Sequence, residues 1–144
     1  MRPARPRLRA AEPGDRETLR RLLADYLFEF DGRTEPYPYF DAYWSEPERL
    51  PLLIEADGEL AGFCLIRVVD DGWSIAEFSV LPARRRTGVG RAAVNIIIER
   101  ASAAAARYLE AKVHPDNGTA LLFWLAAGFR VVDAPGVIIT RRYL

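Results

Sequence analysis

The chain has 144 residues, half of them apolar, which is enough for one domain whose core needs no disulfide or metal. Its 20 basic and 20 acidic residues balance, and no apolar run is long enough to cross a membrane. The only cysteine is Cys64 and the only histidine is His114, so an internal disulfide is excluded and a zinc site is disfavoured. We therefore expect a cytoplasmic protein with no metal and no membrane partner.

Strand and helix periods alternate along the first half of the chain. Pro13-Gly14 ends a first strand and leaves Asp15 as the N-cap of an amphipathic helix. Asp57-Gly58 is a strong hairpin signal between two apolar strands. Residues 31–51 are expected to be irregular and rich in aromatic and acidic side chains, with a short helix over 39–44. The predicted elements are a strand over 7–11, a helix over 15–30, and strands over 52–55, 60–69 and 73–81.

The second half continues the alternation and ends in a hairpin. Gly128 follows a compact apolar segment and is predicted to be the C′ glycine of a helix. The predicted elements are a helix over 91–107, a strand over 109–113, a helix over 119–127, and strands over 130–132 and 137–142. Together the two halves predict one α+β domain over residues 1–144, in which helices flank a mixed sheet.

The segment from Val80 to Arg91 is the most informative part of the sequence. It joins a predicted strand to a predicted helix through Gly88 and Gly90. Glycine permits positive φ angles and close approach of a ligand, and the first turn of a helix offers free N–H groups. The loop therefore predicts a site for a pyrophosphate, although an exposed, arginine-rich turn is the simpler alternative.

Charge raises a second interpretation of this loop. Residues 82–144 carry nine arginines and Lys112 against four carboxylates, whereas residues 1–81 carry ten arginines against sixteen. A positive half would attract a polyanion, and Arg84-Arg85-Arg86 could contact nucleic acid. Zero net charge and the lack of aromatic residues beside these arginines disfavour a nucleic-acid partner.

Two motifs together resemble the GNAT superfamily of N-acetyltransferases, and residues 37–54 also resemble a little-characterised bacterial branch of it. The loop pattern Arg/Gln-x-x-Gly-x-Gly/Ala is present as residues 85–90, after the lead-in Val80-Leu81-Pro82. The second motif is Asn117-x-x-Ala120, followed by Trp124 and by Gly128-Phe129. The resemblance implies a mixed, mostly antiparallel sheet of six or seven strands, splayed between strands four and five and flanked by about four helices.

The resemblance also implies acetyl-coenzyme A as the acyl donor. The loop containing Val89 would hold the pyrophosphate through the backbone N–H groups of Arg85, Arg86, Gly88, Gly90 and Arg91. The backbone of Phe78 and Val80 would pair with the pantetheine arm like an added strand. Asn117 would contact that arm from the far side, Trp124 would orient the sulfur or only pack, and the Val80 N–H would hold the developing oxyanion.

Proton transfer needs side chains, and Glu77 is the candidate base. A carboxylate partly buried at that place in the strand would have a raised pKa. The alternatives are a solvent-facing glutamate or one that only binds the acceptor amine. Many family members have a tyrosine acid where this chain has Trp124, whose indole does not release a proton. Tyr108, Tyr143 and Ser79 are possible substitutes, and nothing in the sequence selects one.

The acceptor is expected to be a small cationic amine or a peptide amino group. The aromatic and acidic region over 26–48 would line the acceptor side, because aromatic faces and carboxylates suit a cation. The candidate acceptor residues are Phe30, Tyr37, Tyr39, Glu77 and His114. A non-catalytic acyl-CoA-binding domain is the alternative function, motivated by the missing tyrosine, and a homodimer is possible.

Overall fold

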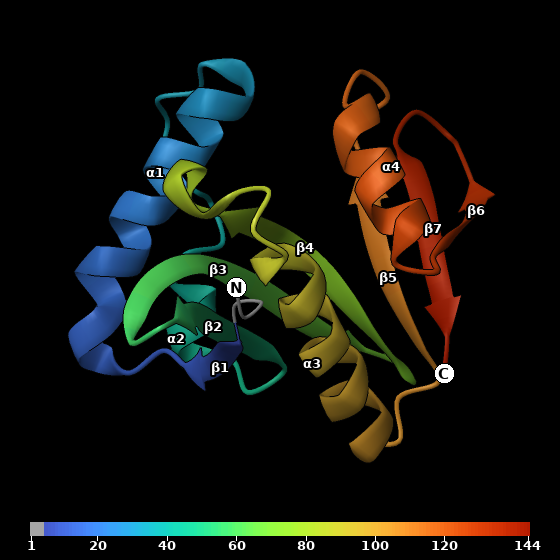
Figure 1. Ribbon diagram of the computed structural model, residues 1–144, viewed down its shortest axis with the longest axis horizontal. Helices are drawn as coiled ribbons and strands as arrows, with labels where there is room; N and C mark the ends of the chain where they lie inside the picture. The colour runs from blue at the N-terminus through green and yellow to red at the C-terminus, as the bar shows by residue number, and fades with distance from the viewer. Residues whose placement is uncertain (1–4) are drawn as a thin grey trace.

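Residues 5–144 are described in the computed structural model, and they form one seven-stranded sheet flanked by helices (Figure 1). The strand order is β1-β2-β3-β4-β5-β7-β6, and all neighbours are antiparallel except the β4–β5 pair. The strands are β1 (Pro6–Ala10), β2 (Arg49–Ala56), β3 (Glu59–Val69), β4 (Gly72–Val80), β5 (Tyr108–Val113), β6 (Arg130–Asp133) and β7 (Ile138–Tyr143). The predicted α+β class and mixed sheet are confirmed.

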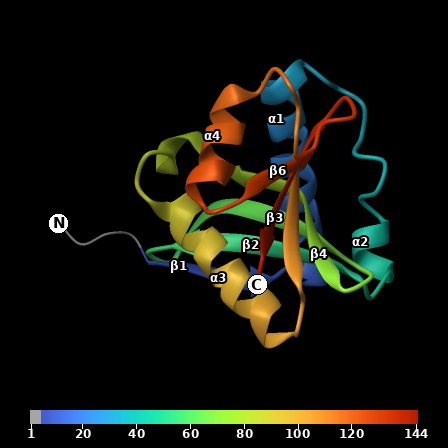
Figure 2. The same ribbon diagram turned by 90° about the vertical axis from the view of Figure 1, so that its right-hand side faces the viewer.

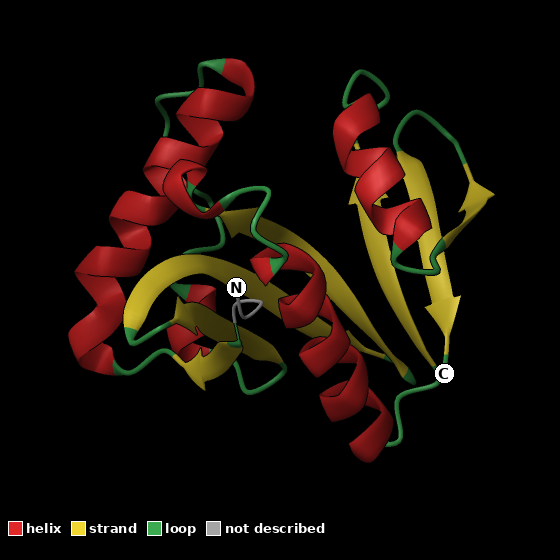
Figure 3. Cartoon of the chain, viewed as in Figure 1, coloured by secondary structure: helices red, strands yellow, loops and turns green. Residues whose placement is uncertain are grey.

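Four α-helices cover the two faces of the sheet, as Figure 2 shows for α3 and α4 on one side and α2 on the other. They are α1 (Arg16–Asp31), α2 (Ala42–Ser45), α3 (Val89–Ala103) and α4 (Gly118–Ala126), and two short 3-10 turns cover Pro13–Asp15 and Pro82–Arg84. In Figure 3 the strands β5, β7 and β6 with α4 form an arm that diverges from the rest of the sheet. The chain thus has an opening between β4 and β5.

Two apolar cores lie on opposite faces of the sheet, and β3 contributes to both. Cys64 and Ile66 face the core beneath α3 and α4, whereas Phe63 and Leu65 face the core beneath α1 and α2. This alternation follows from the two-residue period of a strand. Because β3 is buried on both faces, its sequence is a continuous apolar run, as is typical of a central strand.

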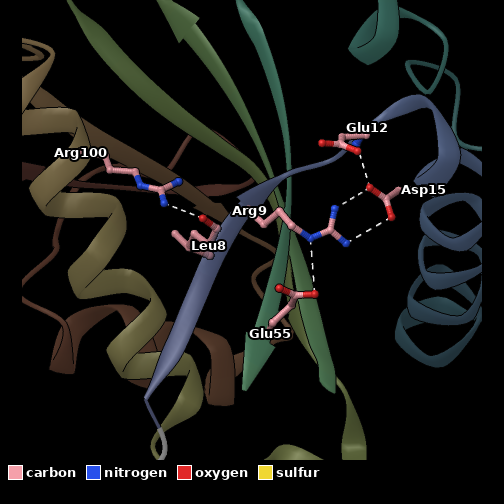
Figure 4. A network of polar contacts seen from close by, with 6 residues as sticks. All are labelled: Leu8, Arg9, Glu12, Asp15, Glu55 and Arg100. Atoms are coloured by element: carbon pink, nitrogen blue, oxygen red, sulfur yellow. Dashed lines mark hydrogen bonds and ion pairs between the residues drawn. The ribbon is translucent and has the colours of Figure 1, made fainter. Parts of the chain in front are cut away.

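Charged side chains attach the N-terminal strand to its neighbours (Figure 4). The Arg9 guanidinium donates to both Asp15 oxygens, at 2.6 and 3.2 Å, and lies 3.4 Å from Glu55 on β2. Arg100 on α3 donates to the Leu8 carbonyl oxygen. These contacts connect β1 to the start of α1 and to α3. They therefore help to set the position of α1 on the sheet.

Three predicted boundaries are wrong by three residues or more, and one of them is the start of α2, which lies at Ala42 instead of residue 39. Helix α3 ends at Ala103 instead of residue 107, because Ala105 adopts a positive φ of 62° and the chain turns toward β5. Strand β2 begins at Arg49, inside the segment predicted to be irregular. Pro51 is tolerated there because it precedes the residues of β2 that pair with β1, so no ladder hydrogen bond to β1 requires its missing N–H.

Candidate active site

The opening arises where β4 loses its parallel partner. Only residues 73–75 of β4 pair with residues 109–111 of β5, although β4 continues to Val80 (Figure 1). On the other edge, the Leu81 N–H donates to the carbonyl oxygen of Ala61 on β3 at 2.8 Å. Because main-chain groups alternate between the edges of a strand, the N–H groups of Phe78 and Val80 point to the edge that β5 has left.

A β-bulge at Ala76 positions Glu77. Leu65 on β3 pairs with Glu77, but the next residue, Ile66, pairs with Ile75, so Ala76 is an extra residue on β4. The bulge places Glu77 on the same face as Leu65, beneath α1, while Ile75 stays on the α3 face. Glu77 therefore lies between α1 and β4, where the aromatic residues of α1 cover it.

Burial changes the acidity of Glu77. Desolvation of its carboxylate raises its pKa from 4.5 to about 7, and the hydrogen bond from the Tyr26 hydroxyl and the nearby Arg33 charge only partly oppose this rise. Glu77 also acts on its neighbours, since its negative charge adds to burial in raising the pKa of Tyr26 and of Tyr37. A carboxyl with a pKa near neutrality can both hold and release a proton at physiological pH.

A cavity of about 320 Å³ lies in this opening, and it brings together residues from both arms of the sheet. Its lining includes six residues proposed from the sequence, namely Phe30, Glu77, Phe78, His114, Asn117 and Trp124. It also includes Tyr26, from the region expected to line the acceptor side, and residues that were not proposed for the site, among them Ala76, Lys112 and Val137. Phe30 and His114 meet edge to face across the opening, with ring centroids 5.9 Å apart.

Trp124 and Asn117 both have structural contacts in this cavity. Trp124 is buried, and its ring packs against Phe78 and Phe129 at centroid distances of 5.5 and 5.0 Å. The Asn117 side-chain oxygen accepts a hydrogen bond from the Ala120 N–H at 3.1 Å, so it is the N-cap of α4. The Asn117 side-chain amide group remains available to a ligand.

The glycine loop has the properties of an anion site. Arg86 and Gly88 adopt positive φ angles of 61° and 86°, and a side chain at Gly88 would meet no atom within 4 Å. The N–H groups of residues 86–91 donate no hydrogen bond to protein atoms within residues 5–144. Six N–H groups without a protein partner, in a loop that is open at Gly88, fit a ligand with several anionic oxygens, such as a pyrophosphate.

Arg84 and Arg85 are occupied within the chain instead of facing this open space. Arg84 binds Asp57 and Glu59 at the β2–β3 turn, at 3.3 and 2.7 Å. The Arg85 N–H donates to Pro82 at 3.3 Å, and its guanidinium donates to both Glu29 oxygens and to the Val80 carbonyl. The Arg85 N–H is therefore less available to a phosphate than the N–H groups of residues 86–91.

The aromatic residues of the segment between α1 and β2 are largely engaged with arginines of the chain itself. The Arg49 guanidinium lies 5.2 Å from the ring centres of both Tyr39 and Tyr43. Tyr37 packs against the same two rings, at centroid distances of 5.9 and 6.5 Å. Tyr37 and Tyr39 do not line the cavity, in contrast to the sequence-based expectation for the acceptor side.

Fold and loop together define the class: a mixed sheet that splays beside a glycine-rich strand–loop–helix turn is the architecture of acyl-CoA N-acyltransferases. The model of the acetyltransferase (GNAT) family matches residues 16–129, and the chain belongs to this family. No helix within residues 5–144 has the length and hydropathy needed to span a membrane. The same residues bring no three His, Cys, Asp or Glu side chains together as metal ligands.

Known proteins are similar to this chain in sequence and in fold. A mycothiol acetyltransferase from Stackebrandtia nassauensis is 36% identical over 78 residues, which are 54% of this chain and 26% of that protein. The chain therefore spans about a quarter of this relative. An acetyltransferase from Thermus thermophilus covers the whole of both chains with a TM-score of 0.81 and 23% identity. The PaiA N-acetyltransferase from Thermoplasma acidophilum, solved with coenzyme A, has a TM-score of 0.79 at 16% identity, over 96% of this chain and 99% of that one.

Proposed function

We propose that residues 1–144 form a single N-acyltransferase domain, which transfers an acetyl group from acetyl-CoA to a primary amine by direct attack in a ternary complex. One observation carries the proposal: Glu77, with its pKa near 7, lies in the cavity beside the edge of β4 that β5 leaves free. Family membership and the coenzyme A complex of the PaiA protein support the choice of donor.

The donor would be held by main-chain groups. The N–H groups of residues 86–91 would bind the pyrophosphate, with Gly88 allowing its close approach, whereas the absence of a side chain at Gly90 makes room for Val80 and Phe123. The free edge of β4 at Phe78 would pair with the pantetheine arm, in the manner of strand addition, whereas the Val80 carbonyl on the same edge is already occupied by Arg85. The free side-chain amide of Asn117 would contact the arm from α4.

Glu77 would act as the general base. When bound, acetyl-CoA supplies an activated thioester, so the protein has to align it with a neutral amine. Glu77 would take the proton from the bound ammonium, directly or through water, because its pKa near 7 matches physiological pH. The amine nitrogen then bonds to the thioester carbon as the carbon–sulfur bond breaks, and coenzyme A leaves as a thiolate. The second proton of the nitrogen, which becomes acidic on attack, passes to solvent and leaves a neutral amide.

The Val80 N–H would stabilise the charge that develops on the thioester oxygen. It points to the free edge of β4, where no strand competes for it. The leaving thiolate finds no tyrosine acid at position 124, and the Trp124 indole does not release a proton. The thiolate would therefore leave as such and take its proton from solvent.

The acceptor would be a small cationic amine or a peptide amino group. Glu77 offers a carboxylate to an ammonium group, and Phe30 and His114 border the cavity beside it. The size of the cavity, about 320 Å³, favours an acceptor whose amine end is slender, because the pantetheine arm must share this space.

Binding and turnover are tested separately. Calorimetry with acetyl-CoA at moderate salt tests the donor site, and absence of binding at high micromolar ligand would refute it. A thiol-release assay over a panel of small amines and peptides then tests transfer. Binding without turnover of any amine would favour the non-catalytic acyl-CoA-binding alternative, whereas release of coenzyme A with formation of the acetylated amine would support the enzyme.

A further inference from the structure

The side chain of Arg85 bridges two parts of the site that are far apart in the sequence. Two nitrogens of its guanidinium donate to the two carboxylate oxygens of Glu29 on α1, at 2.5 and 3.1 Å. Its Nε donates to the main-chain oxygen of Val80, at the end of β4, at 2.9 Å. Glu29 lies on α1 between Tyr26 and Phe30, which line the cavity. Arg85 thus connects the α1 wall of the cavity to the free edge of β4.

This arrangement contributes little to stability. The Arg85 and Glu29 side chains are 42% and 50% exposed, and exposed ion pairs have small net effects on folding because water screens them. The geometry, by contrast, is specific, because a planar guanidinium that binds a carboxylate through two parallel bonds has a fixed orientation. Its third bond, to Val80, then fixes a peptide group of β4.

The fixed group lies at the edge where the thioester is expected. In a strand the N–H and carbonyl of one residue point to the same edge, so the Val80 carbonyl faces the edge that β5 has left, together with the Val80 N–H. By occupying the carbonyl, Arg85 leaves the N–H as the one free main-chain polar group of Val80 at that edge. A carbonyl oxygen left free there would repel an oxygen that gains negative charge.

We propose that Arg85 is a positioning residue: held by Glu29, it fixes the Val80 carbonyl so that the Val80 N–H is directed at the thioester oxygen. Arg85 would thus act through Val80 and not as a phosphate ligand. This inference rests on the proposed function. It adds that Arg85 links α1, which borders the acceptor, to the free edge of β4, where acetyl-CoA is expected to bind.

Arg84 provides a matched control for the kinetic test. Like Arg85 it is an arginine of the loop bound to two carboxylate oxygens, but its partners are Asp57 and Glu59 and it does not contact Val80. We expect Arg85→Gln to lower kcat about tenfold, as for a misdirected oxyanion donor, with KM for acetyl-CoA changed less than about threefold. Arg84→Gln should leave both constants unchanged. Glu29→Gln should have a smaller effect, and adding it to Arg85→Gln should cause no further loss.

A second measurement examines the geometry without turnover. The carbonyl carbon chemical shift of Val80 in the isotope-labelled chain without ligand should move in Arg85→Gln and stay constant in Arg84→Gln, since the Arg85 side chain donates to that oxygen and the Arg84 side chain donates to Asp57 and Glu59 instead. An unchanged shift would refute the contact on which the proposal depends.

The outcomes separate this inference from the proposed function. A higher Kd for acetyl-CoA in Arg85→Gln, with kcat preserved, would make Arg85 a phosphate ligand and overturn the inference alone. Equal losses of kcat in Arg84→Gln and Arg85→Gln would show that both arginines only stabilise the loop, and would also overturn the inference. Failure of the unchanged chain to transfer acetyl groups would instead refute the proposed function.

Discussion

Replacing Glu77 with glutamine should lower activity and raise stability above neutral pH, two effects of opposite sign from one buried carboxylate. The folded chain holds the Glu77 proton more tightly than the unfolded chain, because burial raises the pKa from 4.5 to about 7. This group therefore favours folding below pH 4.5, and its contribution is lost as the pH rises through 7. Glutamine carries no charge and escapes that loss.

The size of the effect follows from the shift in pKa. Each pKa unit corresponds to about 1.4 kcal/mol, so ionising Glu77 in the folded chain costs on the order of 3 kcal/mol. Glu77→Gln should therefore unfold at higher denaturant concentration than the wild type at pH 8, by a free energy of up to about that amount. The difference should shrink toward zero as the pH falls to 4.5.

Activity should respond in the opposite direction. For the wild type, kcat/KM should fall about tenfold for each pH unit below 7 as the base becomes protonated. Glu77→Gln should lower kcat/KM by about 10²- to 10⁴-fold. The pH–rate profile of this variant should also lack the acidic limb, which is the fall in kcat/KM below pH 7. Tyr26→Phe removes a hydrogen bond that lowers the Glu77 pKa, so it should shift the limb to higher pH.

Denaturant melts and pH–rate profiles of the three proteins test this reasoning. An amine acceptor also gains reactivity as the pH rises, so the profiles should be measured with two acceptors of different basicity. If Glu77→Gln kept the wild-type profile, the role of base would be refuted. If this variant were less stable than the wild type at pH 8, the assigned burial of an ionised carboxylate would be wrong.

Three further outcomes follow from the loop, the α4 cap and the thiol. Gly88→Val should abolish acetyl-CoA binding in calorimetry, and circular dichroism should show a folded chain. Because residue 88 has a φ of 86°, the substitution should destabilise the chain by about 1–2 kcal/mol. The control is Gly118→Ala, which also lies in open space but lacks the positive φ, and it should bind acetyl-CoA normally. Asn117→Ala should lower stability by about 1 kcal/mol through loss of the helix cap. Asn117→Asp should keep the cap but lose the side-chain N–H groups. A loss of acetyl-CoA affinity in both variants would therefore identify the contact of Asn117 with the ligand. Cys64 is fully buried and its thiol pKa is raised, so a thiol reagent should detect it in the denatured chain and not in the native one.

Much of the fold could be predicted because local signals were strong. Asp57-Gly58 marked the β2–β3 hairpin, Gly128 marked the end of α4, and the glycines at 88 and 90 marked the loop before α3. The contacts that shape the site were harder to predict, since they join residues far apart in the chain. Glu29 and Arg85 are 56 positions apart, and nothing in the sequence around either one selects the other.

The aromatic segment shows a different limit of sequence reasoning. Aromatic faces next to acidic residues suggested a site for a cationic amine, but the chain supplies its own cations to several of these rings. Arg49 lies over Tyr39 and Tyr43, and Arg16 and Arg20 lie 5.1 and 4.6 Å from the ring centre of Phe40. The composition of a segment therefore does not tell whether an aromatic face is free for a ligand.

The bulge at Ala76 connects the opening of the sheet to the position of the base. Ile75 is the last residue of β4 that pairs with β5, Ala76 is the extra residue, and Glu77 is the first residue beyond it. A bulge bends a strand and increases its twist, which accounts for the parting of β4 from β5 at this place. In a regular strand that contained Ala76 as a paired residue, the two-residue period would place Glu77 on the face of Ile75, among the apolar side chains beneath α3. The sequence carries a trace of the bulge, because Ile75 is out of phase with the alternation of Phe78 and Val80. The bulge thus lies where the edge of β4 becomes free, and it keeps the Glu77 carboxylate on the face of the α1 wall.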